Sequence, residues 1–155
     1  MRKVFILSLL LIAAAFVFSV MVPVPQAFGA DTCLSKPSTS TCDGQDPYTA
    51  GCAADVVDLV TPKTVGSTTV RLRYSPKCQS AWSRVDWYGL TPPVPSIKAC
   101  VYRKVLTTNS PQCTTVGSTN AYSNILFLGR TTYKGYATGT VNSGTPVVTA
   151  EAYGY

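Results

Sequence analysis

Hydrophobic and polar residues alternate with a period of two along much of the chain after residue 30. The clearest case is the sequence VRLRY at residues 70–74, where every second residue is apolar. This alternation is typical of a β-strand with one buried face. Pro76 interrupts it, because proline lacks the N–H that a sheet needs, and residues 81–87 resume as a second strand. The pattern therefore predicts a hairpin over residues 70–87, with Cys78 at its corner.

Further segments with strand character follow one another, separated by turns rich in Gly, Pro, Asn and Ser. They are residues 56–65 with an interruption at Pro62, then 98–106, 112–116, 122–128, 133–141 and 145–153. The end of 122–128 is a continuous apolar run, which predicts a strand buried on both faces. No segment after residue 30 has a sustained helical period. The pattern predicts an all-β fold, a small disulfide-stapled β-sandwich or barrel.

The first residues of the chain have a different character. Arg2 and Lys3 precede an almost wholly apolar stretch at residues 4–22, and small residues follow up to Ala30. This order is that of a secretory signal peptide, which we assign to residues 1–29. An uncleaved anchor is the alternative, because the apolar run is long enough to span a bilayer. We assign 30–41 to a Ser/Thr/Pro-rich tether and 42–155 to a single β domain.

All the cysteines lie after the predicted signal peptide. They are Cys33, Cys42, Cys52, Cys78, Cys100 and Cys113. An even number of cysteines in a small exported domain predicts three disulfides and a secreted, extracellular location. We favour a Cys100–Cys113 pair, because the two residues flank one strand–turn–strand unit, and this leaves Cys78 to pair with one of the first three. A zinc site is not expected, because the chain has no CxxC pair and no histidine.

The charge of the chain is mildly basic. The net charge is +6, and it falls to +4 without the predicted signal peptide, because that segment holds two of the 13 basic residues and none of the 7 acidic ones. This balance is compatible with contact to an anionic cell-wall or extracellular polymer. It is well below that of a nucleic-acid-binding domain. We expect no nucleic-acid partner, and no membrane contact once the signal peptide is removed.

Four short motifs resemble those of a known family. They are C-D-G-Q-D-P at 42–47, G-C-A-A-D at 51–55, R-L-R-Y-S-P-K-C at 71–78 and A-W-S-R at 81–84. As a set, within residues 33–87, they resemble a family of exported bacterial domains catalogued as domain of unknown function 2690. The resemblance implies a secreted or membrane-tethered module of Gram-positive bacteria, and no reaction. The loop between Cys33 and Cys42 is longer than the family pattern, and the Cys100/Cys113 pair looks like an addition to it.

The residue types available exclude most catalytic chemistry. Without histidine, a Ser–His or Cys–His nucleophile pair is impossible, and paired cysteines exclude thiol catalysis. We therefore expect no enzyme activity and no cofactor. Carboxylates remain, and Asp43 and Asp46 share one predicted turn. They are candidates for a calcium site or a glycosidase-type pair, although turn capping is the more ordinary role of such residues.

The candidate ligand-binding residues lie on the predicted central hairpin. They are Trp82, Arg84, Arg71, Arg73 and Tyr74. Trp82 and Arg84 share one strand face, where an aromatic platform beside a charge would suit a sugar polymer. The competing interpretation is that Trp82 is a structural residue and that Arg84 stacks on it or pairs with Asp86.

These observations favour a secreted, non-catalytic module that binds or senses cell-envelope or matrix material. A carboxylate-dependent polysaccharide hydrolase is the first alternative. The second is a self-assembling surface protein, because the C-terminal segment carries little charge and has high β propensity. A flat aromatic and basic patch would favour binding, and a cleft with two carboxylates would favour hydrolysis.

Overall fold

The predicted central hairpin is present and forms the middle of one sheet. β3 (Thr68–Ser75) and β4 (Ser80–Trp87) are antiparallel, with Val70 opposite Val85. The computed structural model describes residues 32–89, 95–105 and 111–155, all within the unit that spans Asp31–Tyr155. The predicted signal peptide lies outside these residues. Within them, no helix is long and apolar enough to cross a membrane.

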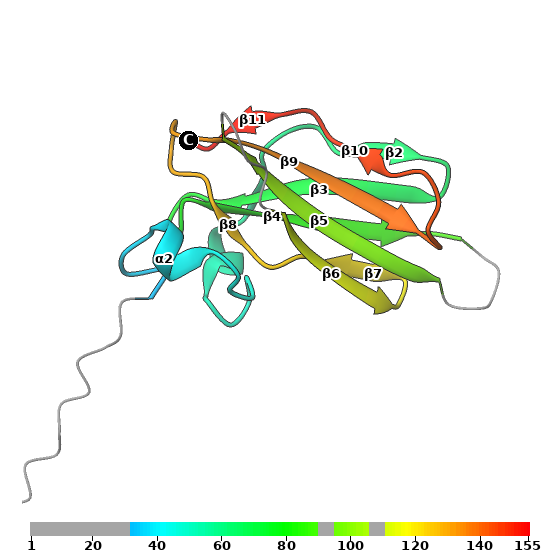
Figure 1. Cartoon of the computed structure of the whole chain (residues 1–155), viewed down its shortest axis with the longest axis horizontal. Helices are drawn as coiled ribbons and strands as arrows, with labels where there is room; N and C mark the ends of the chain where they lie inside the picture. Colours follow the sequence, from blue (N-terminus) through cyan, green and yellow to red (C-terminus); the bar gives the residue numbers. More distant parts are fainter. Residues whose placement is uncertain (1–31, 90–94, 106–110) are drawn as a thin grey trace, which may run out of the picture. The chain divides into compact units, whose positions relative to one another are not determined.

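Two antiparallel sheets form the fold (Figure 1). Sheet A has the order β1 (Val57–Asp58), β3, β4 and β7 (Asn120–Tyr122), while β2 (Lys63–Val65) pairs with β3 and β8 (Leu126–Phe127) with β4. Sheet B has the order β10 (Val147–Val148), β9 (Lys134–Val141), β5 (Ser96–Lys104) and β6 (Gln112–Gly117), while β11 (Ala152–Tyr153) pairs with β9. The predicted all-β, disulfide-stapled fold is confirmed as a sandwich.

Several predicted strands are divided into shorter pieces. Pro62 separates β1 from β2, as the sequence predicts. The prediction of one strand at 122–128, buried on both faces, is wrong. Ile125 leaves the sheet because its N–H donates to the carbonyl of Gln45 at 2.9 Å, so β7 and β8 are separate strands. The segment 145–153 is likewise divided, into β10 and β11.

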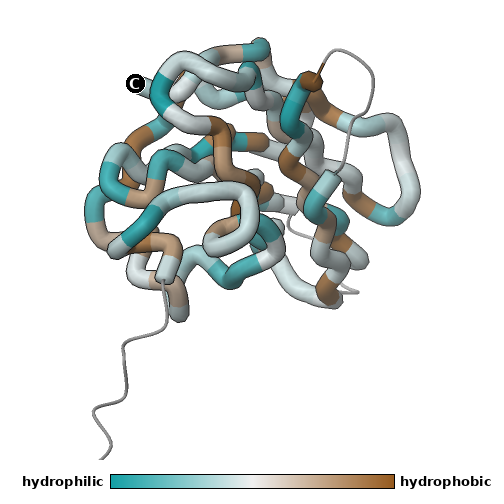
Figure 2. Tube along the Cα trace, turned by 60° about the vertical axis from the view of Figure 1, so that its left-hand side comes forward, coloured by the Kyte–Doolittle hydropathy of each residue, from teal (hydrophilic) through white to brown (hydrophobic). Residues whose placement is uncertain are grey.

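The main core lies between the two sheets. The apolar residues of the alternating strands point into it, among them Val70 and Leu72 on β3 and Ile97 on β5, all of which are fully buried. The hydropathy of the trace changes from residue to residue along the strands, as this one-sided burial requires (Figure 2). At Gly139 on β9 the two sheets pack closely, because a Cβ placed there would lie 2.6 Å from Cγ2 of Val70 in the opposite sheet.

A second, smaller core lies on the outer face of sheet A. The segment Thr32–Val56, which we call the disulfide cap, contains the short helix α2 (Thr39–Cys42) and a 3₁₀ turn at Cys52–Asp55. Its cysteines pack against Trp82 and Ile125 in a cluster of buried residues. Residues 32–41, which we expected to be part of a tether, lie within this cap.

All six cysteines form disulfides. The pairs are Cys33–Cys42, Cys52–Cys78 and Cys100–Cys113. The favoured Cys100–Cys113 pair is confirmed, and it joins residues that lie directly opposite each other on β5 and β6. Cys78, at the corner of the central hairpin, ties that hairpin to the disulfide cap. The cap is thus held to sheet A by a covalent bond as well as by the packing around Trp82.

Candidate functional site

The arginines of the central hairpin share the outer face of sheet A, where they alternate with aspartates. Asp58 accepts a hydrogen bond from Nη1 of Arg71 at 2.9 Å and forms an ion pair with Nη1 of Arg73 at 3.2 Å. Asp86 lies 3.1 Å from Nε of Arg84 and 3.6 Å from Nε of Arg71. The pairing of Arg84 with Asp86 is as expected. The two carboxylates offset most of the charge of the three guanidinium groups, so this face has little net charge to offer an anionic ligand.

The aromatic candidates of the hairpin are buried. Trp82 is 2% exposed beneath the disulfide cap, so its ring cannot serve as a platform for a sugar. Tyr74 is fully buried, and its hydroxyl donates to the carbonyl of Gly129 at 3.1 Å. The structural interpretation of Trp82 thus agrees with the geometry, although its core is the one beneath the cap and not the one between the sheets.

The carboxylates of the predicted calcium turn have protein partners. Asp43 accepts from the backbone N–H of Phe127 and from Nη1 of Arg103, both at 2.7 Å. Asp46 accepts from the N–H groups of Tyr48 and Thr49 at 2.9 and 3.0 Å, as a turn-capping residue does. Within the described ranges, no group of three or more acidic side chains is close enough to hold a cation. Both carboxylates therefore have structural partners within the protein.

Sheet B presents a different set of side chains on its outer face. On β5 and β9 the residues that alternate with the core residues point outward, and many of them are Lys, Tyr or Thr. We call this surface the basic–aromatic face. Its members are Lys98, Tyr102, Lys104, Lys134, Tyr136, Tyr153, Thr115, Thr138 and Thr140, with Glu151 at its border.

Two tyrosines form the centre of the basic–aromatic face. Tyr102 and Tyr136 are opposite each other on β5 and β9, and their rings stack with centroids 4.7 Å apart and planes 1° from parallel. Burial raises the pKa of the Tyr136 hydroxyl, and the nearby Tyr102 and Glu151 raise it further. The pair therefore gives the sheet a rigid aromatic ridge.

Lysines lie on both sides of this ridge. Lys104 and Lys134 are opposite each other at one end, where Lys104 Nζ lies 2.9 Å from Glu151 and Lys134 Nζ lies 5.1 Å from the Tyr153 ring centre. The hydrogen bond to Glu151 raises the pKa of Lys104, so that lysine stays charged well into the alkaline range. Lys98 is exposed at the other end. One carboxylate among three ammonium groups leaves this face basic.

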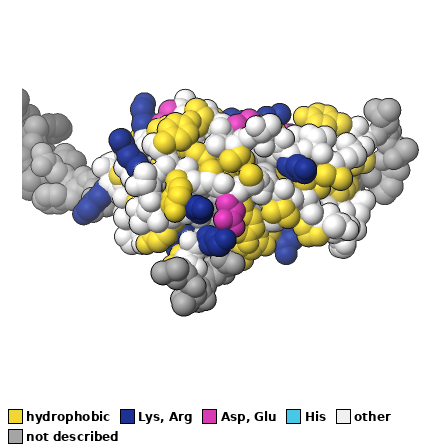
Figure 3. All heavy atoms as spheres, turned by 90° about the horizontal axis from the view of Figure 1, so that it is seen from above, with side chains coloured by type: hydrophobic (Ala, Val, Ile, Leu, Met, Phe, Trp, Pro, Cys, Tyr) yellow, Lys and Arg dark blue, Asp and Glu magenta, His cyan; other side chains and the backbone are white. Residues whose placement is uncertain are grey.

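The basic–aromatic face is flat and open to solvent. Three shallow hollows of about 340, 400 and 350 Å³ lie along it. Lys104 borders the first two and Lys98 the third. Seen from the edge that carries β10 and β11, the surface has basic side chains spread among hydrophobic and uncharged ones, with few acidic ones (Figure 3). This arrangement suits contact with an extended ligand better than enclosure of a small molecule.

Sequence reasoning missed this face, although a signal for it exists. Lys98, Tyr102 and Lys104 are separated by even numbers of residues, as are Lys134 and Tyr136. In two strands, this spacing places all five side chains on one side of each strand. The sequence does not show that β5 and β9 are neighbours, and only this pairing brings the outward side chains of the two strands together.

The acidic side chains are all engaged in the described part of the chain. Asp55, the last residue of the G-C-A-A-D motif, accepts from the Ser75 hydroxyl and from the Lys77 N–H, and so holds the corner of the central hairpin. The others bond to the partners given above.

Together, the fold and the cap define a two-sheet, disulfide-stapled β domain with one sheet face covered and the other open. The chain belongs to the family described as "Protein of unknown function (DUF2690)", whose sequence model matches residues 40–150. The match is longer than the stretch that carries the motifs, and it includes Cys100, Cys113 and most of sheet B. No curated protein and no solved structure matches the chain.

Proposed function

We propose that the protein is a secreted, non-catalytic module that binds an anionic polymer of the cell envelope or extracellular matrix through the basic–aromatic face. The observation that carries the proposal is the stacked Tyr102–Tyr136 pair between exposed lysines on a flat sheet surface. Tyrosine rings contribute rigid contact area at low entropic cost, and ammonium groups attract phosphate or carboxylate groups.

Secretion is supported by two independent features. The start of the chain has the composition of a signal peptide. Three disulfides pair every cysteine, and disulfides form and persist in oxidising compartments outside the cytosol. A polymer-binding role matches this location, because anionic polymers are abundant there.

The absence of catalysis is supported by the residues that remain. The chain has no histidine, and its cysteines are paired. Each of the six described side-chain carboxylates accepts a hydrogen bond from the protein or forms an ion pair with an Arg or Lys side chain. A protein with these properties recognises a polymer by complementarity of charge and shape.

The test is a binding measurement with the purified, secreted protein. Its probes are a phosphate-rich polymer, poly(glycerol phosphate), a carboxylate-rich polymer, polyglutamate, and uncharged dextran as reference. The triple variant Lys98→Gln, Lys104→Gln, Lys134→Gln removes the three lysines of the face. The matched control, Lys63→Gln, Lys77→Gln, Arg130→Gln, removes the same charge from exposed positions elsewhere.

We expect one of the anionic polymers to bind more tightly than dextran and to lose affinity as salt is added, since salt shortens the range over which exposed charges attract each other, to about 8–10 Å near physiological ionic strength. The face variant should weaken binding at least about tenfold, which corresponds to roughly 1.4 kcal/mol. The control variant should retain most of the affinity. Equal losses in the two variants would mean that net charge alone drives binding, and the face would then have no specific role.

A further inference from the structure

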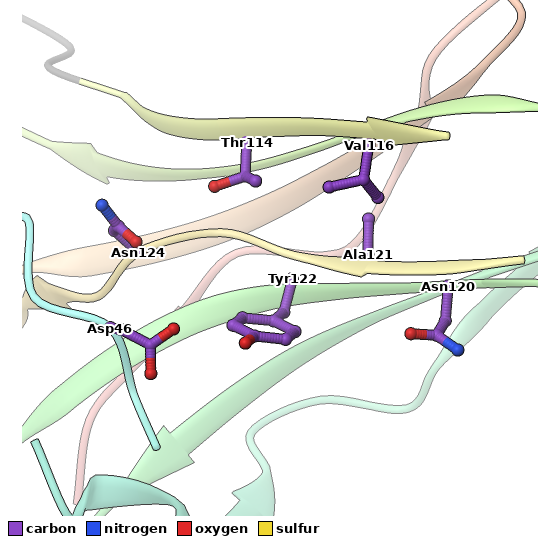
Figure 4. A pocket seen from close by; sticks show the side chains of 7 residues that line it. All are labelled: Asp46, Thr114, Val116, Asn120, Ala121, Tyr122 and Asn124. Atoms are coloured by element: carbon purple, nitrogen blue, oxygen red, sulfur yellow. The ribbon is translucent and has the colours of Figure 1, made fainter. Parts of the chain in front are cut away.

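A second candidate site lies in the seam between the two sheets, away from the basic–aromatic face. There, the edge strand of sheet B, β6, faces the edge strand of sheet A, β7, and a groove of about 180 Å³ separates their side chains. We call it the seam groove. Its lining residues are Asp46, Thr114, Val116, Asn120, Ala121, Tyr122 and Asn124 (Figure 4).

The walls of the seam groove combine an apolar floor with polar ends. Val116 on β6 and Ala121 on β7 point towards each other, while the Tyr122 ring lies on the other side of β7, between Asp46 and Asn120 (Figure 4). Asn124 stands at the same end of the groove as Asp46. An aromatic ring bordered by hydrogen-bonding groups suits a sugar ring, because the C–H face of a sugar is apolar and its rim carries hydroxyls.

The acidic end of the groove is held in place by its own turn. Asp46 is fixed by the N–H groups of Tyr48 and Thr49. Burial raises the pKa of Tyr122, and the charge of Asp46 and a hydrogen bond to it raise this pKa further. The Tyr48 ring meets the Tyr122 ring edge-on, with centroids 4.9 Å apart, and it is 52% exposed. One tyrosine thus forms the floor while the other offers an open ring beside it.

The two asparagines have hydrogen-bonding capacity to spare. The amide groups of Asn120 and Asn124 make no hydrogen bond to any residue in the described ranges, although both line the groove. Each can donate two hydrogen bonds and accept two, which matches vicinal hydroxyls or an acetamido group. No basic side chain lines the groove, so an anionic ligand would meet Asp46 without compensation.

We infer that the seam groove binds one uncharged sugar unit of a glycan, with the two asparagines and Asp46 bonding its polar groups and the tyrosines packing on its apolar face. The volume is below the roughly 300–1,000 Å³ of pockets for drug-sized ligands, so one ring fits and a longer chain extends beyond it. An extended peptide added to the free edge of β6 is the competing occupant. It would use backbone groups and would leave the side-chain amides unsatisfied.

The test uses N-acetylglucosamine oligomers of different lengths as probes, with the purified, secreted protein. Binding is followed by NMR chemical-shift changes and by calorimetry. Asn124→Ala and Asn120→Ala each remove one amide from the groove. The control Tyr88→Ala truncates an exposed aromatic side chain, 62% exposed, outside the groove lining. Thermal unfolding of each variant confirms that it is folded.

We expect at least one probe to bind and each asparagine variant to weaken it about tenfold, since each amide loses one or two hydrogen bonds to the ligand. Tyr88→Ala and the triple lysine variant of the basic–aromatic face should leave this binding unchanged. The inference is overturned if no probe binds at millimolar concentration or if both asparagine variants bind like wild type. The triple lysine variant is measured both with sugars and with anionic polymers. Loss of polymer binding with retained sugar binding, or the reverse, shows which of the two sites has failed.

Discussion

Replacement of Trp82 by alanine should remove a large part of the stability of the domain. The side chain is 2% exposed and lies in the core beneath the disulfide cap. A buried aromatic side chain removes about 150–250 Å² from water, which at ~25 cal/mol per Å² corresponds to roughly 4–6 kcal/mol. Measured Trp-to-Ala truncations cost about 3–5 kcal/mol. Because the free energy of unfolding of a small domain is about 5–15 kcal/mol, this one substitution removes a large part of it.

The assay is thermal unfolding of the secreted protein, followed by circular dichroism without reductant. For a domain of this size, the expected loss lowers the melting temperature by roughly 10–20 °C. Tyr88→Ala is the control, because Tyr88 follows the same strand but is 62% exposed. Its change should stay within about 0.5 kcal/mol. Trp82→Phe should fall between wild type and Trp82→Ala, since it leaves a smaller cavity.

The reasoning has a clear point of failure. If Trp82→Ala melts within about 3 °C of wild type, the disulfide cap does not depend on packing over Trp82, and its covalent links alone would hold it. A variant that melts normally but no longer binds the anionic polymers would go further. It would place Trp82 on an accessible surface and return it to the list of binding residues.

Three further predictions concern other parts of the molecule. Asp43→Ala should lower the urea-unfolding free energy by about 2–4 kcal/mol, because it removes the carboxylate partner of the Arg103 guanidinium, which then keeps only the Phe127 carbonyl as acceptor, and it leaves the Phe127 N–H without its acceptor. Gly139→Val should cost about 1–3 kcal/mol in calorimetry, since even its Cβ would lie 2.6 Å from Val70 Cγ2. Burial raises the pKa of Tyr74 above 10.0. The stability that the neutral Tyr74 hydroxyl contributes is fully present below the pKa of the unfolded state, about 10, and is lost as the pH rises towards the pKa of the folded state. The urea midpoint of the wild type should therefore fall above pH 10, and that of Tyr74→Phe should fall less.

The strands of the main core were predictable because their signal is local. Alternation at residues 70–74 determines which side chains face inward, and Pro62 determines where the first β segment divides. The division at Ile125 was not predictable. An apolar run fits a buried strand, and only the long-range bond to Gln45 turns Ile125 towards the disulfide cap.

The candidate site was predicted less well, because it depends on which faces remain open. Arg71, Arg73 and Arg84 are adjacent to one another, as expected, but Asp58 lies on a strand whose register the sequence does not give. That aspartate changes a basic patch into an ion-pair network. In sheet B, by contrast, strand pairing creates a basic face. Lys98 and Lys134 are far apart in the chain and share one face only because β5 pairs with β9.

The pairing of the cysteines has a consequence for how the chain oxidises. Along the sequence the bonds join the first cysteine to the second, the third to the fourth and the fifth to the sixth. Consider a chain that enters an oxidising compartment from its N-terminus. When the second, fourth or sixth cysteine along the chain arrives, the only reduced thiol already present is that of its native partner. Native bonds then form in order of emergence, and no non-native bond has to be reshuffled by thiol–disulfide exchange. A simple oxidant should therefore suffice for maturation, without an isomerase.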